Sequence, residues 1–155
     1  MARVAIPTWF FAMVVVRLGR RFLVVRERKH EQRWYLPAGR VEPGEAIVAA
    51  AARETFEESG LHVVIEGVLR VEHGAGADGS ARVRVWLVAR PADDAPPKHV
   101  ADEHSLEARW VTLEELDALA LRGDEVRAVF RHVADGGAVY PMSVLRPEGA
   151  PWGPR

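Results

Sequence analysis

The sequence predicts an α/β fold, an α/β/α sandwich in which a mixed β-sheet lies between two helical layers. Two observations carry this prediction. Strand-like apolar segments are followed by a loop, a helix and further strands, which is the order expected of a sheet covered by helices. The helix expected at residues 45–59 is amphipathic, with Val48, Ala51 and Thr55 on the side away from Glu57. That apolar side is expected to pack on the sheet.

The first half of the chain predicts a hairpin, a short strand, a loop and a long helix. Segments rich in β-branched and aromatic residues predict the strands, and Pro37 ends the third of them. Gly60 is typical of the residue that follows a helix. These elements are expected at residues 10–16 and 21–25 for the hairpin, 34–36 for the strand, 39–44 for the loop and 45–59 for the helix.

The second half predicts three more strands and two short helices. Directly after the expected strand at residues 107–111, Thr112 and Glu115 have the spacing of a capping box, which predicts a helix start. The expected strands are 62–72, 81–89 and 107–111, the loops are 74–80 and 91–105, and the helices are 112–119 and 124–133. The loop at 91–105 contains three prolines, and long ordered loops often bind ligands.

Alternation within residues 81–89 predicts a strand with two different faces. Val83, Val85 and Leu87 lie on one face, and the other face carries Arg82, Arg84 and Trp86. After the last helix, residues 136–155 contain four prolines and four glycines, which predicts a mobile tail. The chain is therefore expected to form one domain at residues 1–135, followed by a tail at 136–155.

Composition excludes several classes of function. The net charge of −1 over 155 residues gives no reason to expect binding to bulk nucleic acid or to an anionic membrane. The chain has no cysteine, which excludes disulfides, thiolate metal sites and a cysteine nucleophile and fits a cytoplasmic location. The apolar run at residues 6–16 is too short to span a bilayer and lacks the basic start of a signal peptide, so it is expected to be a buried strand.

The expected long helix carries three glutamates on one face near its C-terminal end. Glu54, Glu57 and Glu58 stand at i, i+3 and i+4, so their carboxylates converge. Like charges at this spacing cost roughly 0.2–0.5 kcal/mol per pair, and the negative end of the helix dipole adds a similar penalty. Helix propensity therefore does not explain the cluster. The alternatives are a solvated acidic face, with Arg53 as its counter-charge, and a hard-oxygen site for Mg²⁺ or Mn²⁺.

The spacing around these glutamates identifies a known motif. It reads Gly39, five residues, Glu45, seven residues, and then the run 53–61 with the sequence Arg-Glu-Thr-Phe-Glu-Glu-Ser-Gly-Leu. This pattern resembles the Nudix box, and a looser resemblance extends over residues 9–120. Thr55 departs from the family, which usually has a bulky apolar residue there, and Ala38 stands where a second glycine is common.

The resemblance implies a divalent-cation site for Mg²⁺ or Mn²⁺. It implies that Glu57 and Glu58 are the principal ligands and that Glu54 either binds the cation or acts as general base. Arg53 is expected to hold the glutamates in place rather than to touch the substrate. The remaining implied ligands are the Gly39 carbonyl, Glu45 through a water or another residue, and one further acidic residue downstream: Glu103, with Asp102 and Glu107 as alternatives. A solvated loop charge without a ligand role is the other interpretation of Glu103.

Aromatic side chains on two of the expected strands are the candidates for substrate binding. Phe10 and Phe11 on the first strand, and Trp86 on the 81–89 strand, are able to stack on a nucleobase. Aromatic residues on a first strand are more often part of the core, and that alternative stays open. The histidines show no paired ligand spacing, so they are expected to be ordinary surface or core residues.

The function that the resemblance implies is metal-dependent hydrolysis of a diphosphate bond in a nucleoside diphosphate derivative. Isoprenoid diphosphate isomerisation, also found on this fold, relies on a cysteine and is excluded. A non-catalytic nucleotide-binding regulator is an alternative, although such proteins typically lose box glutamates. Residues 34–45 and 71–91 resemble the branch that hydrolyses 8-oxo-guanine nucleoside diphosphates, while ADP-ribose and dinucleoside polyphosphates stay open. The expected partner is a small nucleotide, and the sequence leaves open whether the chain forms a homodimer.

Overall fold

Seven strands and three α-helices are present in residues 1–153, which are the residues that the computed structural model describes. The last two residues of the predicted tail, 154 and 155, lie outside this range. The elements are β1 (Thr8–Leu18), β2 (Arg21–Arg26), β3 (Trp34–Tyr35), β4 (Ala38–Arg40), α1 (Ile47–Ser59), β5 (Val63–Ala75), β6 (Ala81–Pro91), β7 (Glu107–Val111), α2 (Leu113–Leu116) and α3 (Glu125–Ala134), with short 3₁₀ turns at His30–Gln32 and Met142–Val144.

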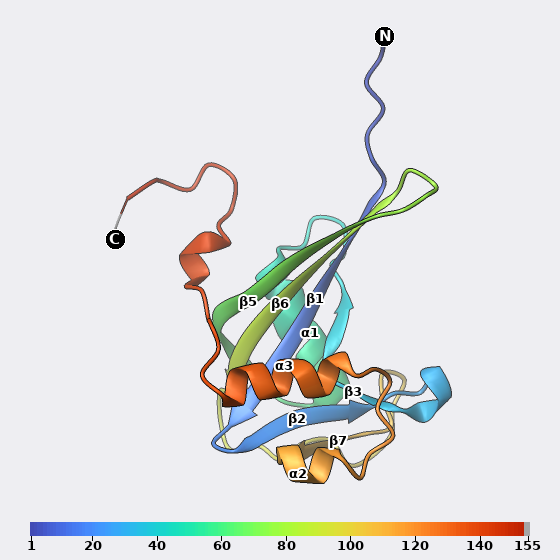
Figure 1. Ribbon diagram of the computed structural model, residues 1–155, viewed down its shortest axis with the longest axis vertical. Coiled ribbons are helices and arrows are strands. Elements are labelled where there is room, and N and C mark those ends of the chain that lie inside the picture. The colour runs from blue at the N-terminus through green and yellow to red at the C-terminus, as the bar shows by residue number, and fades with distance from the viewer. Residues whose placement is uncertain (154–155) are drawn as a thin grey trace.

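The sheet is mixed and separates two helical layers, as the sequence predicts. The strand order is β3-β2-β1-β6-β5, with β4 paired to β1 and β7 paired to β2. β1 and β6 run parallel, whereas the other pairs are antiparallel. Figure 1 shows α3 crossing one face of the sheet and α1 behind the other face. The α/β/α sandwich is confirmed.

The position of β1 explains its unbroken apolar sequence. β1 is central, and its two faces belong to different cores. Ala12, Val14 and Val16 belong to the core on the α1 side, and Met13 and Val15 to the core on the α3 side. All five are at most 4% exposed, because both faces of the strand are covered.

The two helices pack on these cores through their apolar sides. On α1, Ala51 and Thr55 are fully buried as predicted, and so is Ala50, whereas Val48, also predicted on the packing side, is only half-buried. On α3, Phe130 stacks on Phe22 of β2 with ring centroids 4.5 Å apart. Gly60 ends α1 in the left-handed conformation, at φ 75°, that a glycine adopts without strain.

The alternation predicted for residues 81–89 is confirmed by β6. Val85 and Leu87 lie in the core on the α1 side, whereas Trp86 lies in the core on the α3 side. α3 covers that second face. Glu125 at the start of α3 therefore meets Arg84 of β6 at the edge of this core.

Several boundaries differ from the prediction. Residues 39 and 40 were expected in a loop but form β4 together with Ala38, because their backbone pairs with residues 11–13 of β1. The hairpin of β1 and β2 pairs at two positions only, because β6 and β4 take most of the hydrogen-bonding groups of β1. β5 and β6 pair up to Ala75 and Ala81, so the turn between them is shorter than the predicted loop 74–80.

The predicted helices at 45–59 and 112–119 are both shorter in the structure. α1 begins at Ile47, because Glu45 still belongs to a turn in which its N–H donates to the Glu42 carbonyl. α2 has four residues with the expected capping box of Thr112 and Glu115, and the chain then tightens into turns of the i to i−3 type. Strand β7 has the predicted bounds.

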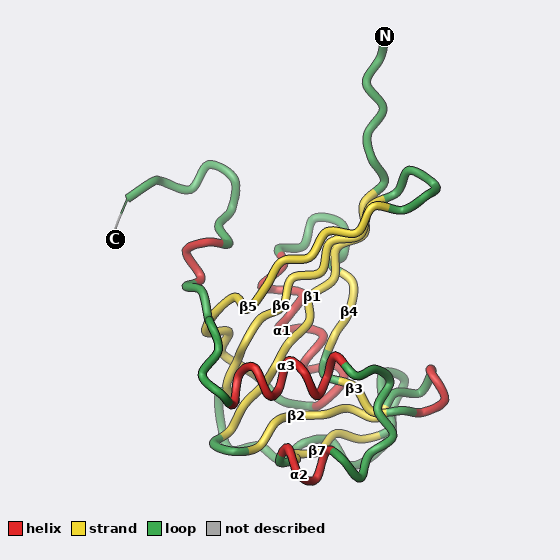
Figure 2. The backbone as a smooth tube through the Cα atoms, in the orientation of Figure 1, coloured by secondary structure: helices red, strands yellow, loops and turns green. Residues whose placement is uncertain are grey.

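Part of the tail lies along the edge strand β5. Tyr140 exchanges backbone hydrogen bonds with Val68, both at 2.8 Å. Figure 2 shows the chain leaving α3 and passing beside β5 before it moves away from the sheet. None of the helices within residues 1–153 is long and apolar enough to cross a bilayer.

Candidate active site

One arginine holds the acidic face of α1 together. The Arg53 guanidinium donates to both carboxylate oxygens of Glu45, at 2.7 and 2.9 Å. Its Nη1 donates to Glu54 at 2.8 Å and to Glu57 at 3.1 Å. These charge-assisted hydrogen bonds offset the repulsion that the i, i+3 and i+4 spacing creates. Arg53 is therefore occupied by the glutamates rather than free to face a ligand.

Gly39 lies directly against the carboxyl group of Glu54. A Cβ atom at this position would overlap with the carboxyl carbon and both oxygens of Glu54. β4 brings Gly39 there by pairing with β1, and the N–H of its neighbour Ala38 donates to Glu58 at 3.4 Å. Glycine leaves room for the carboxylate as it lies here, and a larger residue would make the Glu54 side chain shift, so the box loop borders the acidic face of α1 directly.

The cluster contains carboxyl groups whose charged form is unfavourable. Burial raises the pKa of Glu54, although Arg53 acts in the opposite direction. Burial also raises the pKa of Glu58 well above its usual range, and the charge of Glu54 adds to this effect. The hydrogen bonds from Arg53 lower the pKa of Glu45 instead. A further positive charge beside Glu54 and Glu58 would favour their ionised forms.

The donor set fits a divalent cation in its chemistry, although the side chains are not arranged around one. Within residues 1–153, no group of three or more His, Asp or Glu side chains is placed so that it could hold a metal ion. The ion pairs with Arg53 explain this, because they direct oxygens of Glu54 and Glu57 toward the guanidinium. The hard-oxygen donors and the space that Gly39 leaves for Glu54 fit Mg²⁺ or Mn²⁺.

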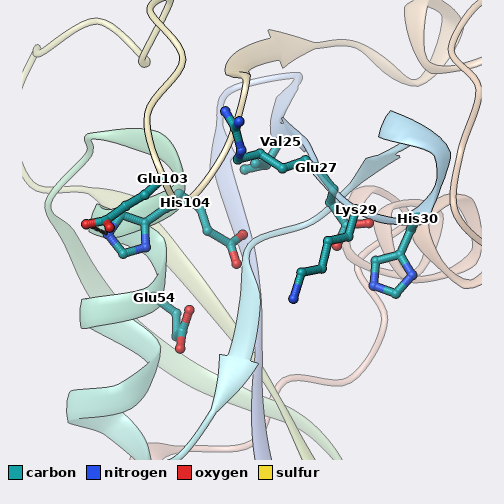
Figure 3. A pocket seen from close by; sticks show the side chains of 9 residues that line it. Val25, Glu27, Lys29, His30, Glu54, Glu103 and His104 are labelled. Atoms are coloured by element: carbon teal, nitrogen blue, oxygen red, sulfur yellow. Dashed lines mark ion pairs between the residues drawn. The ribbon is translucent and has the colours of Figure 1, made fainter.

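A cleft of about 270 Å³, the acidic cleft, opens beside this face. Figure 3 shows Glu54 on α1 on one side, and Glu27, Lys29 and His30 on the other. Its lining residues are Val25, Glu27, Arg28, Lys29, His30, Glu54, Glu58, Glu103 and His104.

Among the acidic residues that the sequence offered as a further ligand, Glu103 lines the acidic cleft. Its side chain is 86% exposed and lies 3.4 Å from His104. Asp102 instead pairs with Lys98 at 2.6 Å, and Glu107 pairs with Arg109 at 3.0 Å. The structure therefore leaves Glu103 as the member of this set that faces the cleft.

The loop that carries Glu103 is fastened to the C-terminal end of α1. Lys98 Nζ donates to the Glu57 carbonyl at 2.5 Å, and Ser105 Oγ donates to the Glu58 carbonyl at 2.6 Å. The hydrogen bond from Lys98 lowers the pKa of Asp102 to about 2. Sequence reasoning missed Lys98 and Ser105, because their role depends on a helix end that is distant in the chain.

A second cavity of about 580 Å³, the arginine-rich pocket, adjoins the acidic cleft. The two cavities share Glu27, Lys29 and His30. The arginine-rich pocket is lined by Phe11, Met13, Glu27, Lys29, His30, Tyr35, Ala38, Gly39, Arg40, Arg82, Arg84, Arg122 and Glu125.

Two carboxylates and two arginines of this pocket are paired with each other. Arg84 donates to Glu125 at 3.2 Å, and Arg122 donates to Glu27 at 2.8 Å. The Tyr35 hydroxyl also donates to Glu125. Burial opposes the ionisation of Glu125, but the hydrogen bonds from Tyr35 and Arg84 lower its pKa. Glu125 is therefore a charged acceptor inside the pocket.

Three further cations of the pocket make no ion pair with a carboxylate of the described residues: Lys29, Arg40 and Arg82. Arg82 lies over the Phe11 ring, 4.4 Å from its centroid, and Arg40 lies over Trp9. Unpaired cations around a cavity favour an anionic ligand.

The structure separates the three aromatic residues predicted to bind substrate. Phe11 lines the arginine-rich pocket, whereas Phe10 faces a different cavity with Trp9 and Val41. Trp86 is 3% exposed, and its Nε1 donates to Glu72 at 2.5 Å. Phe10 lies elsewhere because neighbouring residues of a strand point to opposite faces, and Trp86 is covered by α3. Sequence reasoning missed Tyr35, Glu27 and Glu125, which no motif singles out.

Comparison with known proteins gives one matching family and several similar chains. The NUDIX domain family matches residues 9–132. The 8-oxo-dGDP phosphatase NUDT18 of Homo sapiens is 46% identical over 128 residues, which are 81% of this chain and 37% of the human protein. The chain thus spans little more than a third of that relative.

Two further relatives match over nearly their whole length. Phosphatase NudJ of Escherichia coli strain K12 is 32% identical over 133 residues, which are 84% of this chain and 86% of NudJ. A NUDIX hydrolase structure from Nitrosomonas europaea superimposes with a TM-score of 0.75 at 25% identity and covers 92% of this chain and 99% of its own. The family match, the box at residues 39–61 and the shared fold together show that this chain belongs to the Nudix hydrolase family.

Proposed function

We propose that this protein is a metal-dependent hydrolase that cleaves the phosphoanhydride bond of a nucleoside diphosphate. The observation that carries the proposal is the contact between two unlike cavities. The acidic cleft contains Glu54 and Glu58, and the arginine-rich pocket beside it contains unpaired cations, Phe11 and Glu125. A nucleoside diphosphate has two matching ends: the diphosphate would occupy the acidic cleft with its cation, and the base would occupy the arginine-rich pocket.

The residues that would hold the cation are those of the box. Glu54 and Glu58 would supply carboxylates from the acidic cleft, and Glu103 lines the same cleft from the long loop. Glu57 shares their face of α1 but is not among the residues that line the cleft, and the Gly39 backbone is adjacent to Glu54. When bound, a divalent ion such as Mg²⁺ or Mn²⁺ neutralises phosphate charge and activates water for attack on phosphorus. Whether Glu54 holds this ion or accepts the proton of the attacking water stays open.

Lys29 is the cation that lies where the two cavities meet. Because no carboxylate of the described residues neutralises it, its ammonium group is available to donate to a phosphate oxygen. Arg40 and Arg82 line only the arginine-rich pocket, where they lie over the Trp9 and Phe11 rings. Arg53 has a different task, since its bonds to Glu45, Glu54 and Glu57 orient the carboxylates.

We further propose that 8-oxo-guanine diphosphates are preferred among nucleotides. The human relative is named as a phosphatase of 8-oxo-dGDP, which supports this substrate class. An 8-oxo-guanine carries a hydrogen on N7 where guanine has only a lone pair, so its recognition requires an acceptor. Glu125 is a suitable acceptor, because Tyr35 and Arg84 keep its carboxylate ionised and fixed inside the pocket.

A panel assay tests both parts of the proposal. Purified protein with Mg²⁺ is given GDP, 8-oxo-GDP, 8-oxo-dGDP, ADP-ribose and a dinucleoside tetraphosphate, and kcat/KM is measured for each. We expect a higher kcat/KM on the oxidised guanine nucleotides, by up to ~10⁴-fold if Glu125 pairs with N7–H. Equal values on GDP and 8-oxo-GDP, or faster cleavage of ADP-ribose, would remove the preference. No metal-dependent turnover of any nucleotide would favour a binding module instead.

A further inference from the structure

Glu27 has a buried oxygen that the protein leaves without a partner. It follows β2, and its Oε1 accepts a hydrogen bond from Arg122 Nη1 at 2.8 Å. Its Oε2 is the one buried side-chain nitrogen or oxygen atom within residues 1–153 that has no hydrogen-bond partner. Burial of a carboxylate oxygen without a donor is unfavourable, and native proteins contain few such groups. The unpartnered oxygen therefore points to a ligand that donates a hydrogen bond.

The position of Glu27 restricts what this ligand is. Glu27, Lys29 and His30 are the three residues that line both the acidic cleft and the arginine-rich pocket. Arg122 fixes the carboxylate from the pocket side, and the Arg122 guanidinium in turn lies over the Tyr35 ring, 4.9 Å from its centroid. The free oxygen is thus held in place at the junction of the two cavities.

The backbone beside this junction is strained. His30, Glu31 and Gln32 have φ values of 54°, 59° and 55°, which L-residues other than glycine rarely adopt. Consecutive left-handed residues are costly, and strain of this kind is concentrated at ligand-binding sites. It agrees with a ligand at the segment that follows β2.

We propose that Glu27 accepts a hydrogen bond from a sugar hydroxyl of the bound nucleotide. This proposal rests on the proposed function. If the diphosphate occupies the acidic cleft and the base occupies the arginine-rich pocket, the sugar that links them lies at their junction. A carboxylate only accepts hydrogen bonds and a sugar hydroxyl donates them, whereas the cation of Lys29 suits a phosphate oxygen.

The first test compares substrates on the unaltered protein. The ribonucleoside diphosphate of the panel with the highest kcat/KM is compared with its 2′-deoxy, 3′-deoxy and 2′,3′-dideoxy analogues, and kcat/KM is measured for each. Loss of the hydroxyl leaves a charged acceptor unpaired, so we expect the dideoxy analogue to lose about 10- to 100-fold. The two monodeoxy analogues identify which hydroxyl is read. Equal kcat/KM for the parent nucleotide and its three analogues would overturn the proposal without any variant being made.

The second test uses Glu27→Gln, which keeps the size of the side chain. Arg122 will hold the amide oxygen, which places the NH₂ group where Oε2 was and turns the acceptor into a donor. We expect the ratio of kcat/KM between the parent nucleotide and its dideoxy analogue to fall toward one. Glu31→Gln is the matched control, because Glu31 is on the same segment but lines neither cavity, and it should keep the ratio of the unaltered protein.

Mn²⁺ titration followed by electron paramagnetic resonance separates this role from cation binding. We expect Glu27→Gln to bind Mn²⁺ as the unaltered protein does. A tenfold weaker Mn²⁺ affinity in Glu27→Gln would mean that Glu27 is a cation ligand and would overturn the proposal. If the unaltered protein cleaves nucleoside diphosphates but ignores the sugar hydroxyls, this inference alone fails; if it cleaves none, the proposed function fails.

Discussion

The positive charge of Arg53 partly neutralises the glutamates on the acidic face of α1. Its guanidinium reaches Glu45, Glu54 and Glu57, so the charges that a cation would neutralise are already balanced in part. The contacts with Glu54 and Glu57 use Nη1 alone, whereas Glu45 takes two bonds. A cation bound by Glu54 and Glu57 would therefore displace the contacts of Nη1 and leave the pair of Arg53 and Glu45 intact.

Glu57→Gln is expected to lower turnover by about 10²–10³-fold with little change in stability. The variant removes a proposed cation ligand, which costs several kcal/mol of transition-state stabilisation. Folding should hardly change, because a partly exposed ion pair is worth about 0–1 kcal/mol and Arg53 keeps its other partners. Kinetics with Mg²⁺ and thermal melting in metal-free buffer measure the two effects. Glu66→Gln, an exposed glutamate on β5, serves as the control. Full activity, or a markedly lower melting temperature, would contradict the assignment of Glu57.

Glu125 is expected to make stability depend on pH in the acid range. Its folded pKa lies below its ordinary value of 4.5, so its contribution is present above that pH and is lost as pH falls. Since the side chain is 38% exposed, we expect Glu125→Gln to cost about 0.5–1 kcal/mol at pH 7. Melting curves at several pH values measure the difference from the unaltered protein. The difference should shrink below pH 4.5, and one that stays constant or grows would show that the ion pair is not its cause.

Spacing in the sequence identified the box residues but not the rest of the site. Glu54, Glu57 and Glu58 share one helix, so the period of 3.6 residues places them on one face. Glu27 and Glu125 are far apart in the sequence. They line the same pocket only because the end of β2 and the start of α3 both border it. No local pattern in the sequence carries that proximity.

At the scale of elements, local signals predicted helices and strands better than their pairing. The capping residues of α2 and the bounds of β7 were correct because turn and cap chemistry is local. β4 was missed because its three residues have no alternation and owe their conformation to β1. The parallel pairing of β1 with β6 joins segments that are distant in the chain, and only the packed sheet decides it.

The junction of α1 with the long loop predicts a role for Lys98 in stability. Its side chain is 11% exposed and contacts the Glu57 carbonyl, Ser105 and Asp102. Lys98→Met removes a cation from the C-terminal end of α1 and takes away the side-chain donor to the Glu57 carbonyl, whereas Asp102 keeps its bonds from the backbone N–H groups of His104 and Ser105. We expect a loss of about 1–3 kcal/mol, or roughly 3–10 °C in Tm.

Lys29→Met is the matched control for this variant, since the chain contains only these two lysines. Lys29 is exposed and makes no ion pair among the described residues, so its loss should change stability by less than about 0.5 kcal/mol. Thermal melting of both variants decides the matter. Equal melting temperatures for the two would show that the bonds of Lys98 do not hold the loop to α1.

At the scale of the whole molecule, the sandwich determines where chemistry can take place. Both faces of β1 are buried, so ligands are excluded from the centre of the sheet. The segment after β2 lines both the acidic cleft and the arginine-rich pocket, and the box loop lines the arginine-rich pocket through Gly39. α3, which lies on the other side of the sheet from α1, adds Glu125 to that pocket. The unbroken apolar run of β1 predicted the buried strand, whereas the cavities depend on how the layers meet.

The tail is expected to stabilise the domain through its first ten residues. Val139 packs against Gly67 so closely that a Cβ at Gly67 would overlap with it, and Met142 and Leu145 pack on the core of the α1 side. Deletion of residues 136–155 uncovers this surface and the outer edge of β5, where Tyr140 pairs with Val68 on the side away from β6. From the apolar area involved we expect a loss on the order of 2–4 kcal/mol and a tendency to associate.

A second truncation, which removes only residues 147–155, keeps these contacts and should melt as the full chain does. Melting curves and sedimentation of the two truncated proteins test the predicted division at residue 135. Composition predicts a separable mobile tail, whereas the packing of Val139, Met142 and Leu145 predicts that the folded unit extends to about residue 146. If the chain that ends at residue 135 melts like the full protein and stays monodisperse, the contacts with β5 contribute nothing and the shorter domain is correct.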